Sequence, residues 1–342
     1  MVVAGATSSL SPGIAEALAA LHNMVNVAGT FLVSGHCDPD VIRQGIAAAR
    51  ACYASTIAVI GGGTVIDAGK AVAALAHQND HHDIDRFVSN GLPIVPSFAL
   101  KWAAMPTTSG TGSESTSNSV LEMGNEKVSL RGVPPASLIV ADPELTHSQP
   151  LGSAAVSAAD ALAQALEVLA SGDSSPAAQD VALCAITALA EGIRLMGTET
   201  ELASYWLSWG SLLMGIAFAH GRLGLPHALA HFCTKYGMNH GNMVGILLAA
   251  GLVVQSRDRG VVERLHRVSD ALGVNSCVDW ARESSAQLLA MAGLPATLAK
   301  AGLSPDELRW IARHELRLRP RLGIPPRVAT EEELIEVLSL SL

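Results

Sequence analysis

Charged and aromatic residues are scarce in this sequence. Of its 342 residues, 15% are charged and 4% are aromatic, whereas 49% are hydrophobic. This balance excludes the class of disordered proteins, which have too little apolar surface to bury a core. The core must instead be built from Ala, Leu, Val and Ile. The length predicts two domains, because a domain usually has about 100–200 residues.

Basic residues and long apolar runs are also lacking. Lys and Arg number 22 against 31 Asp and Glu, which gives a formal net charge of −9. A nucleic-acid partner is therefore not expected, because such partners require a cationic surface. No apolar run reaches the roughly 18 residues of a membrane-spanning helix, and the N-terminus lacks the basic and apolar regions of a secretory signal. We expect a soluble, cytoplasmic protein with no membrane partner.

Cysteine motifs are absent as well. The sequence has five cysteines, an odd number, and no two of them have the CxxC spacing. A disulfide framework or a cysteine zinc site is therefore not expected.

The first 150 residues alternate short β-branched runs with alanine-rich segments. Strands that alternate with helices of about 10–15 residues are typical of parallel βαβ packing. We therefore predict a Rossmann-like domain with a parallel sheet over residues 1–150. The predicted strands are 1–4, 29–33, 55–60 and 138–140, and the predicted helices are 12–22, 40–53 and 64–76.

From about Leu151 the sequence becomes predominantly helical, and the turn-forming residues 148–152 mark the boundary. The predicted fold class is thus α/β plus all-α, with an all-helical domain over residues 151–342. Its predicted helices are 160–170, 176–194, 201–219, 227–236, 240–254, 260–272 and 277–292.

Three glycines, Gly61, Gly62 and Gly63, connect a predicted strand to a predicted helix. Glycine lets the backbone approach a ligand closely, and a helix start offers free N–H groups and a positive dipole end to an anion. Thr64 is able to cap that helix and to donate to a phosphate oxygen. The turn matches neither of the standard phosphate-binding motifs. Taken alone, it fits a phosphate site and an ordinary tight connection equally well.

A second loop, residues 105–116, combines many hydroxyl groups with glycines. Hydroxyl side chains are able to hydrogen-bond phosphate and ribose without carrying charge. An ordinary polar surface loop has a similar composition, but two such loops in one α/β domain favour a nucleotide site.

The helical half contains histidines at a spacing that suits a shared metal ion. His227 and His231 lie four residues apart on one helix face, and His240 follows nine residues later. This spacing fits a divalent metal site and a pair of hydrogen-bonded core histidines equally well. Upstream, Asp160 and Gln164 are also four residues apart, and a carboxylate in this apolar segment needs a partner such as a metal or a helix end.

A competing cluster lies in residues 77–85, which include three histidines and three aspartates. It falls in a polar loop at a predicted helix end. We interpret it as solvated surface rather than as a metal site.

Together these segments resemble the iron-containing (group III) alcohol dehydrogenase family. Residues 61–70 (GGGTVIDAGK) are similar to its pyrophosphate turn, and residues 106–114 (PTTSGTGSE) to its second cofactor loop. Residues 160–162 (DAL) are similar to the start of its metal helix. The remaining metal-site helices are similar to residues 223–231 (LGLPHALAH) and 239–241 (NHG). The similarity is collinear over most of the chain.

The resemblance implies an α/β dinucleotide domain, a helical domain and a catalytic cleft between them, as in the dehydroquinate synthase-like and group III alcohol dehydrogenase architecture. Hydride would pass between the nicotinamide and a carbonyl carbon, with the metal as Lewis acid. Asp160, His227 and His240 are the implied metal ligands. Asp160 and His227 are also the implied catalytic residues, together with His231, which would relay a proton.

The resemblance also implies a set of cofactor-binding residues. These are Gly61, Gly62, Gly63, Thr64, Asp67, Thr107, Thr108, Thr111, Ser113 and Lys127, with Gly5 and Ser8 in the turn after the opening strand.

One position departs from the family pattern. The family normally has a histidine four residues after the aspartate as its fourth metal ligand, and this sequence has Gln164. An amide oxygen is a poorer donor to Fe²⁺ or Zn²⁺ than an imidazole, so the site would hold either metal more weakly. A metal-independent reductase, with His231 or water supplying the proton, stays open.

The cofactor preference depends on the turn after the opening strand. Family members that prefer NAD tend to carry an aspartate there, which accepts from the ribose 2′-hydroxyl. Residues 4–9 (AGATSS) have no carboxylate, so NADP is favoured over NAD.

The leading hypothesis is a homodimeric NAD(P)H-dependent oxidoreductase that interconverts a small aldehyde or ketone and its alcohol. One alternative is a redox-neutral lyase similar to dehydroquinate synthase. The other is a catalytically silent nucleotide-binding subunit that regulates a partner.

Overall fold

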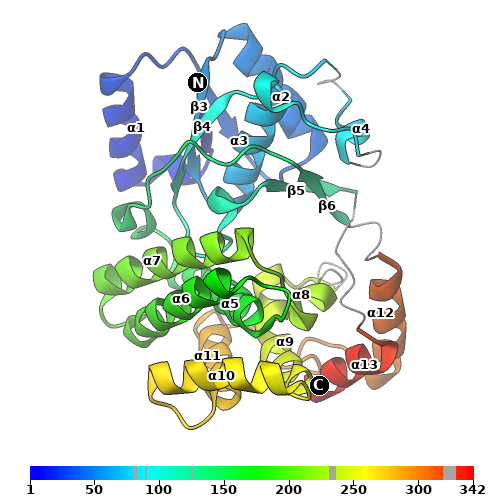
Figure 1. Cartoon of the computed structure of the whole chain (residues 1–342). Helices are drawn as coiled ribbons and strands as arrows, with labels where there is room; N and C mark the ends of the chain where they lie inside the picture. The colour runs from blue at the N-terminus through cyan, green and yellow to red at the C-terminus, as the bar shows by residue number, and fades with distance from the viewer. Residues whose placement is uncertain (80–82, 89–90, 125, 231–235, 319–328) are drawn as a thin grey trace. The chain divides into compact units, whose positions relative to one another are not determined.

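The computed structural model describes residues 1–79, 83–88, 91–124, 126–230, 236–318 and 329–342. Contacts between residues divide the chain into two compact units (Figure 1). The first comprises residues 1–108 and 112–149, and the second comprises residues 109–111 and 150–342.

The first unit is built on a parallel sheet of five strands in the order β2-β1-β3-β4-β7. The predicted parallel α/β fold is therefore confirmed. A two-stranded antiparallel hairpin, β5–β6, accompanies the sheet. The strands are β1 (Val2–Gly5), β2 (Thr30–Val33), β3 (Thr56–Gly61), β4 (Lys101–Pro106), β5 (Asn118–Met123), β6 (Glu126–Arg131) and β7 (Leu138–Ile139).

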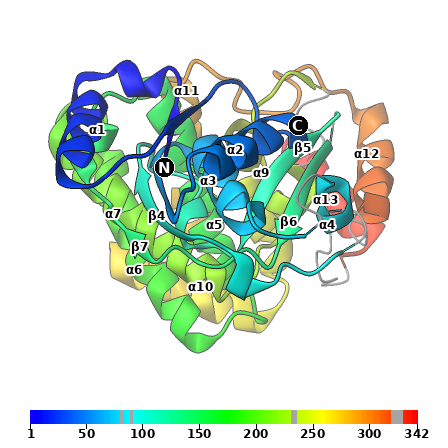
Figure 2. The same ribbon diagram turned by 90° about the horizontal axis from the view of Figure 1, so that it is seen from above.

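Helices cover both faces of this sheet (Figures 1 and 2). Side chains alternate between the faces along each strand. Val3 and Val59 point to the face covered by α2 and α3, whereas Val2 and Ile60 pack with Ile14 of α1 on the other face. The helices are α1 (Pro12–Met24), α2 (Pro39–Ala51), α3 (Gly63–Leu75) and the short α4 (Ile84–Val88), with 3₁₀ turns at Ser8–Leu10, Pro96–Phe98, Ser113–Ser115 and Pro143–Thr146.

The strand order determines where a ligand fits best. From β1 the chain moves to β2 on one side and then to β3 on the other side. In open parallel sheets, ligands bind outside the carboxyl ends of the strands where the order reverses in this way. Here that position lies beside Gly5 at the end of β1 and Gly61 at the end of β3.

The second unit is helical around α5, which contacts α6, α7, α9 and α11. Most side chains of α5 and α9 are buried, as expected for helices that are apolar on nearly every side. The helices are α5 (Leu151–Ala170), α6 (Pro176–Leu195), α7 (Thr200–Ala219), α8 (Leu225–Leu229), α9 (His240–Gln255), α10 (Arg259–Leu272), α11 (Cys277–Met291), α12 (Pro305–Leu318) and α13 (Glu331–Leu340).

Two predicted helix boundaries were wrong. Helix α5 begins at Leu151, directly after Pro150, rather than at Asp160. Helix α8 (Leu225–Leu229) begins two residues before the start of the predicted helix 227–236, of which residues 231–235 lie outside the described residues. Its early start follows from Pro226, because proline suits the first turn of a helix.

Two helices of this unit, α5 and α7, are long and apolar enough to cross a membrane by length and composition alone. The prediction that no apolar run reaches this length was therefore wrong, and residues 202–219 of α7 carry no charge. The most apolar 18-residue stretch of α5 is 78% buried inside the protein, and that of α7 is 44% buried. Buried core helices of soluble proteins are often as long and as apolar, so these two helices are weak evidence for a membrane contact.

Candidate functional site

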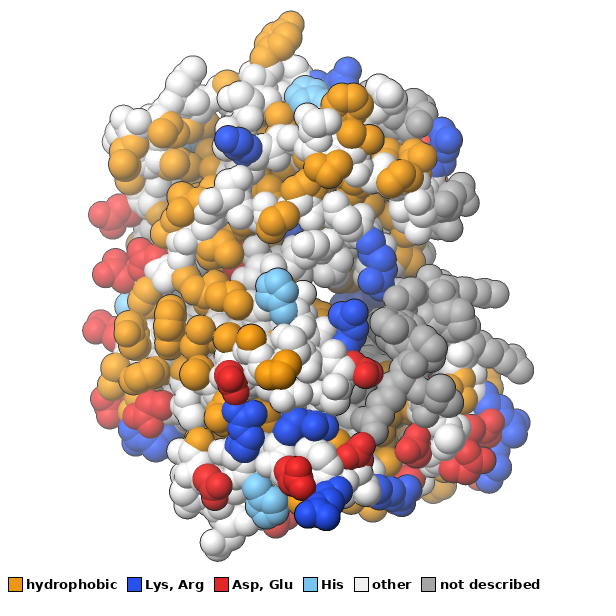
Figure 3. Space-filling view, viewed as in Figure 1, with side chains coloured by type: hydrophobic (Ala, Val, Ile, Leu, Met, Phe, Trp, Pro, Cys, Tyr) orange, Lys and Arg blue, Asp and Glu red, His pale blue; other side chains and the backbone are white. Residues whose placement is uncertain are grey.

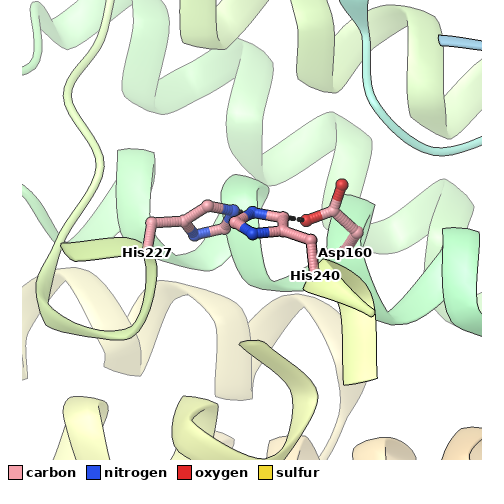
Figure 4. Close-up of side chains that lie close together, drawn as sticks. All are labelled: Asp160, His227 and His240. Atoms are coloured by element: carbon pink, nitrogen blue, oxygen red, sulfur yellow. Dashed lines mark hydrogen bonds and ion pairs between the residues drawn. The ribbon is translucent and has the colours of Figure 1, made fainter. Parts of the chain in front are cut away.

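Asp160, His227 and His240 lie together in the second unit (Figure 4). Each offers one ligand atom, and the three atoms lie within 4.8 Å of one another. Asp160 Oδ1 is 3.3 Å from His227 Nε2 and 3.8 Å from His240 Nε2. Within the described residues, no other group of three His, Cys, Asp or Glu side chains is arranged to hold a metal ion.

Three helices bring these side chains together. Asp160 lies in the middle of the buried helix α5, His227 lies in the first turn of α8, and His240 opens α9. A Cβ atom at Gly241 would lie 2.6 Å from the backbone oxygen of Val156, so only glycine permits the start of α9 to approach α5 this closely. The approach places His240 beside Asp160.

The site is arranged to stabilise positive charge. Burial would raise the pKa of Asp160, but the hydrogen bond with His227 and the charges of His240 and His227 lower it below its usual value. Burial would lower the pKa of His227. The negative charge of Glu167 and the hydrogen bonds to Asp160 and Glu167 outweigh that effect and raise this pKa to about 10.

Gln164 lies one helical turn after Asp160 and contacts its carboxylate. Its Nε2 donates to Asp160 Oδ2 at 3.0 Å, which leaves Asp160 Oδ1 to face the histidines. Its Oε1 is buried and has no hydrogen-bond partner in the described part of the chain. A buried carbonyl oxygen without a partner is costly, and a cation or its bound water would satisfy it.

Glu167, on the same helix, was not among the predicted site residues. It is completely buried, and its carboxylate accepts from the N–H of Gly224 and contacts the ring of His227. The signal that could have identified it was the expectation that a carboxylate in this apolar segment needs a partner, such as a metal or a helix end.

The first unit brings together the glycine turn and parts of two other predicted cofactor segments. Gly5, the last residue of β1, lies against Val65 of α3. Gly62 lies so close to Thr108 that a Cβ atom would be 3.1 Å from that side chain. Helix α3 begins with the N–H groups of Val65 and Ile66 bonded to the oxygen of Gly62. The first N–H groups of a helix have no partner within it, so the start of α3 is the kind of place where an anion is able to bind.

Thr64 does not cap this helix as predicted. The N-cap residue is Gly62, so Thr64 lies within the first turn, where its side chain is exposed. Thr64 would be the N-cap only of a helix that begins at Val65, whereas α3 begins at Gly63. The hydroxyl group of Thr64 remains accessible to a ligand.

Asp67 and Ser113 belong to a buried network beneath the turn. The Ser113 hydroxyl donates to Asp67 Oδ1 at 2.6 Å. Lys70 Nζ lies 3.1 Å from the same carboxylate oxygen. It also donates to the backbone oxygen and to the side-chain hydroxyl of Ser113, at 2.7 Å each. Lys70 also donates to Thr116 Oγ1 at 3.1 Å. These contacts attach the hydroxyl-rich loop to α3.

The other predicted residues lie in different places. Thr107 is buried at the end of β4. Ser8 lies in the 3₁₀ turn after β1, and Lys127 lies on β6 of the hairpin, opposite Glu122. Thr111 belongs to the second unit. His231 lies outside the described residues, as do the central residues 80–82 of the competing cluster, whose His77 is exposed.

We predict a pH-dependent effect for Glu114, which follows Ser113. Burial, more than any other cause, raises the pKa of Glu114 to about 7 from 4.5. Because the folded state holds this proton more tightly than the unfolded state, stability falls as the pH rises from about 4.5 to 7, by about 3 kcal/mol. Thermal unfolding of the Glu114→Gln variant should show a higher Tm than the parent at pH 8 and no difference near pH 4.5.

The control for this prediction is Glu144→Gln, which removes an exposed carboxylate from the same unit. That variant should follow the parent at both pH values. A Glu114→Gln variant whose Tm falls with pH as steeply as that of the parent would contradict the prediction.

The first unit is a parallel α/β unit with a glycine turn, and the second is a helical unit that brings Asp160, His227 and His240 together. This combination defines a class of protein with a candidate nucleotide site and a candidate metal site. Residues 1–143 match the family model for iron-containing alcohol dehydrogenases, and residues 154–342 match that for the C-terminal part of the Fe-containing alcohol dehydrogenase family. The chain belongs to the iron-containing alcohol dehydrogenase family. This confirms the predicted family and the prediction that the chain is an oxidoreductase.

Individual relatives are similar over most of the chain. A 1,3-propanediol dehydrogenase of Citrobacter freundii is 28% identical over 312 residues, which cover 86% of this chain and 78% of that protein. An NAD-dependent methanol dehydrogenase of Bacillus methanolicus is 26% identical, covering 88% and 81%.

A solved structure supports the fold. The structure of sulfoacetaldehyde reductase from Bifidobacterium kashiwanohense in complex with NAD⁺ has a TM-score of 0.85 at 24% identity, covering 99% of this chain and 90% of that chain.

Proposed function

We propose that this chain is an NAD(P)H-dependent oxidoreductase that interconverts a small aldehyde or ketone and its alcohol. A divalent metal held by Asp160, His227 and His240 would assist the reaction. The set of one carboxylate and two imidazoles, of which Asp160 and His227 are buried and His240 is half-buried, is the observation that carries this proposal. The names of the relatives, which act on propanediol, methanol or sulfoacetaldehyde, support the substrate class.

The donor set fits Fe²⁺ or Zn²⁺. Two ligand atoms at about 2.1 Å from one ion lie about 3–4 Å apart. The distances of 3.3 Å and 3.8 Å from Asp160 Oδ1 to the two histidines lie in that range. The unpartnered Oε1 of Gln164 offers one more oxygen near the set, although it is a weaker donor than a histidine. When bound, the metal supplies a Lewis acid for the carbonyl oxygen and the reduced nicotinamide supplies the hydride.

The protein's own residues orient the reactants. Asp160 and His227 have side-chain exposures of 9% and 8%, whereas that of His240 is 27%. A carbonyl compound would therefore approach from the side of His240. In the first unit, the start of α3 would bind the pyrophosphate and the hydroxyl groups of Thr64 and Thr108 would donate to it. His231 remains the predicted proton donor to the product.

NADPH should be preferred over NADH. The 3₁₀ turn that follows β1 contains Ser8 and Ser9 and no carboxylate, so nothing in it repels a 2′-phosphate. We expect a KM for NADPH several-fold below that for NADH in initial-rate measurements with a panel of small aldehydes. Equal or higher KM values for NADPH would contradict this preference.

The same measurement tests the proposed function. Failure of both cofactors to bind at millimolar concentration would contradict the oxidoreductase proposal. Tight binding without oxidation by any aldehyde or ketone would favour the silent subunit, and product formation without net oxidation would favour the redox-neutral lyase.

We also propose that the enzyme is cytoplasmic and homodimeric. The described cysteines Cys37, Cys52, Cys184 and Cys277 are free thiols, which suits a reducing compartment.

The homodimer is supported by the surface of α7. Hydrophobic side chains gather over the region of α7 (Figure 3), and exposed apolar surface of this kind is typically covered by another protein chain. The exposed large hydrophobic side chains on α7 are Leu202, Tyr205, Trp209 and Ile216. Sedimentation velocity would measure the mass in solution.

A further inference from the structure

Glu167 is an ionisable side chain with no exposed surface, in the middle of the helical unit. It lies on α5, two turns after Asp160, and its neighbours along the helix are apolar. A buried carboxylate is tolerated only when hydrogen-bond donors satisfy it. The donors that satisfy Glu167 therefore indicate its role.

All of these donors come from the start of α8. Oε2 accepts from the N–H of Gly224 at 2.5 Å and from the N–H of His227 at 3.4 Å. Oε1 lies 2.5 Å from His227 Nδ1. The carboxylate thus holds both the backbone that leads into α8 and the imidazole ring of His227.

The contact with the ring determines which nitrogen is available to a cation. An ionised carboxylate only accepts hydrogen bonds, so Nδ1 must carry a proton where it meets Glu167. The other nitrogen, Nε2, points the opposite way and lies 3.3 Å from Asp160 Oδ1 (Figure 4). Glu167 and Asp160 therefore hold the ring from its two sides.

We infer that Glu167 is a positioning residue of the metal centre, which keeps the Nδ1 proton of His227 in place and directs Nε2 to the ion. The inference rests on the proposed metal centre. A carboxylate behind a histidine ligand also makes the ring a stronger donor, and its loss typically weakens metal binding about 10–100-fold. This contribution matters more here because Gln164 offers only an amide oxygen where a further imidazole would bind more strongly.

The variant Glu167→Gln separates this role from that of a backbone anchor. Its amide oxygen is still able to accept from the N–H of Gly224. Its NH₂ group, however, would donate to Nδ1 and so favour the ring form with the proton on Nε2, which blocks the metal. Glu283→Gln, on the exposed side of α11, makes the same change of charge in the same unit and serves as the control.

Titration of chelator-stripped protein with Co²⁺, followed by its visible absorption, measures metal binding without any turnover. We expect Glu167→Gln to bind Co²⁺ about 10–100-fold more weakly than the parent, and Glu283→Gln to bind it as the parent does. If Glu167→Gln does not fold, Glu167→Asp retains the charge with a shorter reach and should also bind Co²⁺ more weakly. Unchanged affinity in a folded Glu167 variant would overturn the inference.

A second readout uses the metal-free protein with ¹⁵N-labelled histidine. The parent should show a slowly exchanging Nδ1 proton on His227, which the Glu167→Gln variant should lose. If the parent binds no Co²⁺ but its Nδ1 proton signal is lost in Glu167→Gln, the proposed metal centre is wrong. The positioning of His227 by Glu167 then still stands. If the proton signal is the same in both proteins, the positioning role is wrong, whatever the metal affinity.

Discussion

Replacement of His227 by alanine should lower kcat for aldehyde reduction by at least roughly a thousandfold, because metal-assisted charge stabilisation contributes several kcal/mol to the barrier. The variant loses one of two imidazole ligands. It also leaves the buried carboxylates of Asp160 and Glu167 without the ring that contacts both of them. The measurement is the initial rate of NADPH or NADH oxidation with saturating aldehyde and added Fe²⁺ or Zn²⁺.

The control for this experiment is His266→Ala, which removes an exposed histidine from α10 in the same unit. It should keep the kcat of the parent. Circular dichroism should establish that the His227→Ala protein is folded before the rates are compared. A folded His227→Ala protein with parental kcat would exclude this histidine as an essential ligand.

The second large effect concerns the stability of the first unit. Lys70→Met should lower Tm by roughly 10 °C, because removal of one member of a buried ion pair costs about 3–5 kcal/mol. Lys70 has no exposed surface. Within the part of the chain that the structure describes, its loss leaves the charge of Asp67 with only the Ser113 hydroxyl as a close donor. Nucleotide binding should weaken in parallel, because the same ammonium group attaches the hydroxyl-rich loop to α3.

A double variant distinguishes an unpaired charge from a lost packing contact. Asp67→Asn in the Lys70→Met background removes the uncompensated charge, so the double variant should be more stable than the single one. Differential scanning calorimetry provides both Tm values. A single variant that unfolds at the parental temperature would show that the ion pair does not stabilise this unit.

The fold could be predicted where the local pattern of residues determines the structure. The alternation of β-branched and alanine-rich segments indicated the parallel sheet, and its strands β1 and β3 lie close to their predicted positions. Strand β4 (KWAAMP) has no β-branched residue, so its strand propensity is low and it was not predicted. Its parallel pairing with β3 over six residues is a tertiary effect.

The candidate site was only partly accessible from the sequence. Asp160 and His227 are 67 residues apart, and only the family resemblance placed them together in advance. The network of Asp67, Lys70 and Ser113 joins residues 43–46 positions apart, and no local spacing indicates such contacts. Glu167 shows the same limit, because the segment around it indicated that it needs a partner but not which one.

Chelator removal and reconstitution test the central claim most directly. The rate of NADPH oxidation with an aldehyde would be measured on the same preparation before stripping, after stripping and after addition of Fe²⁺ or Zn²⁺. We predict a loss of at least roughly a thousandfold on stripping and recovery on addition of metal, with the Gln164→His variant recovering at a lower metal concentration. Equal rates in the stripped and the reloaded protein would contradict a metal centre formed by Asp160, His227 and His240.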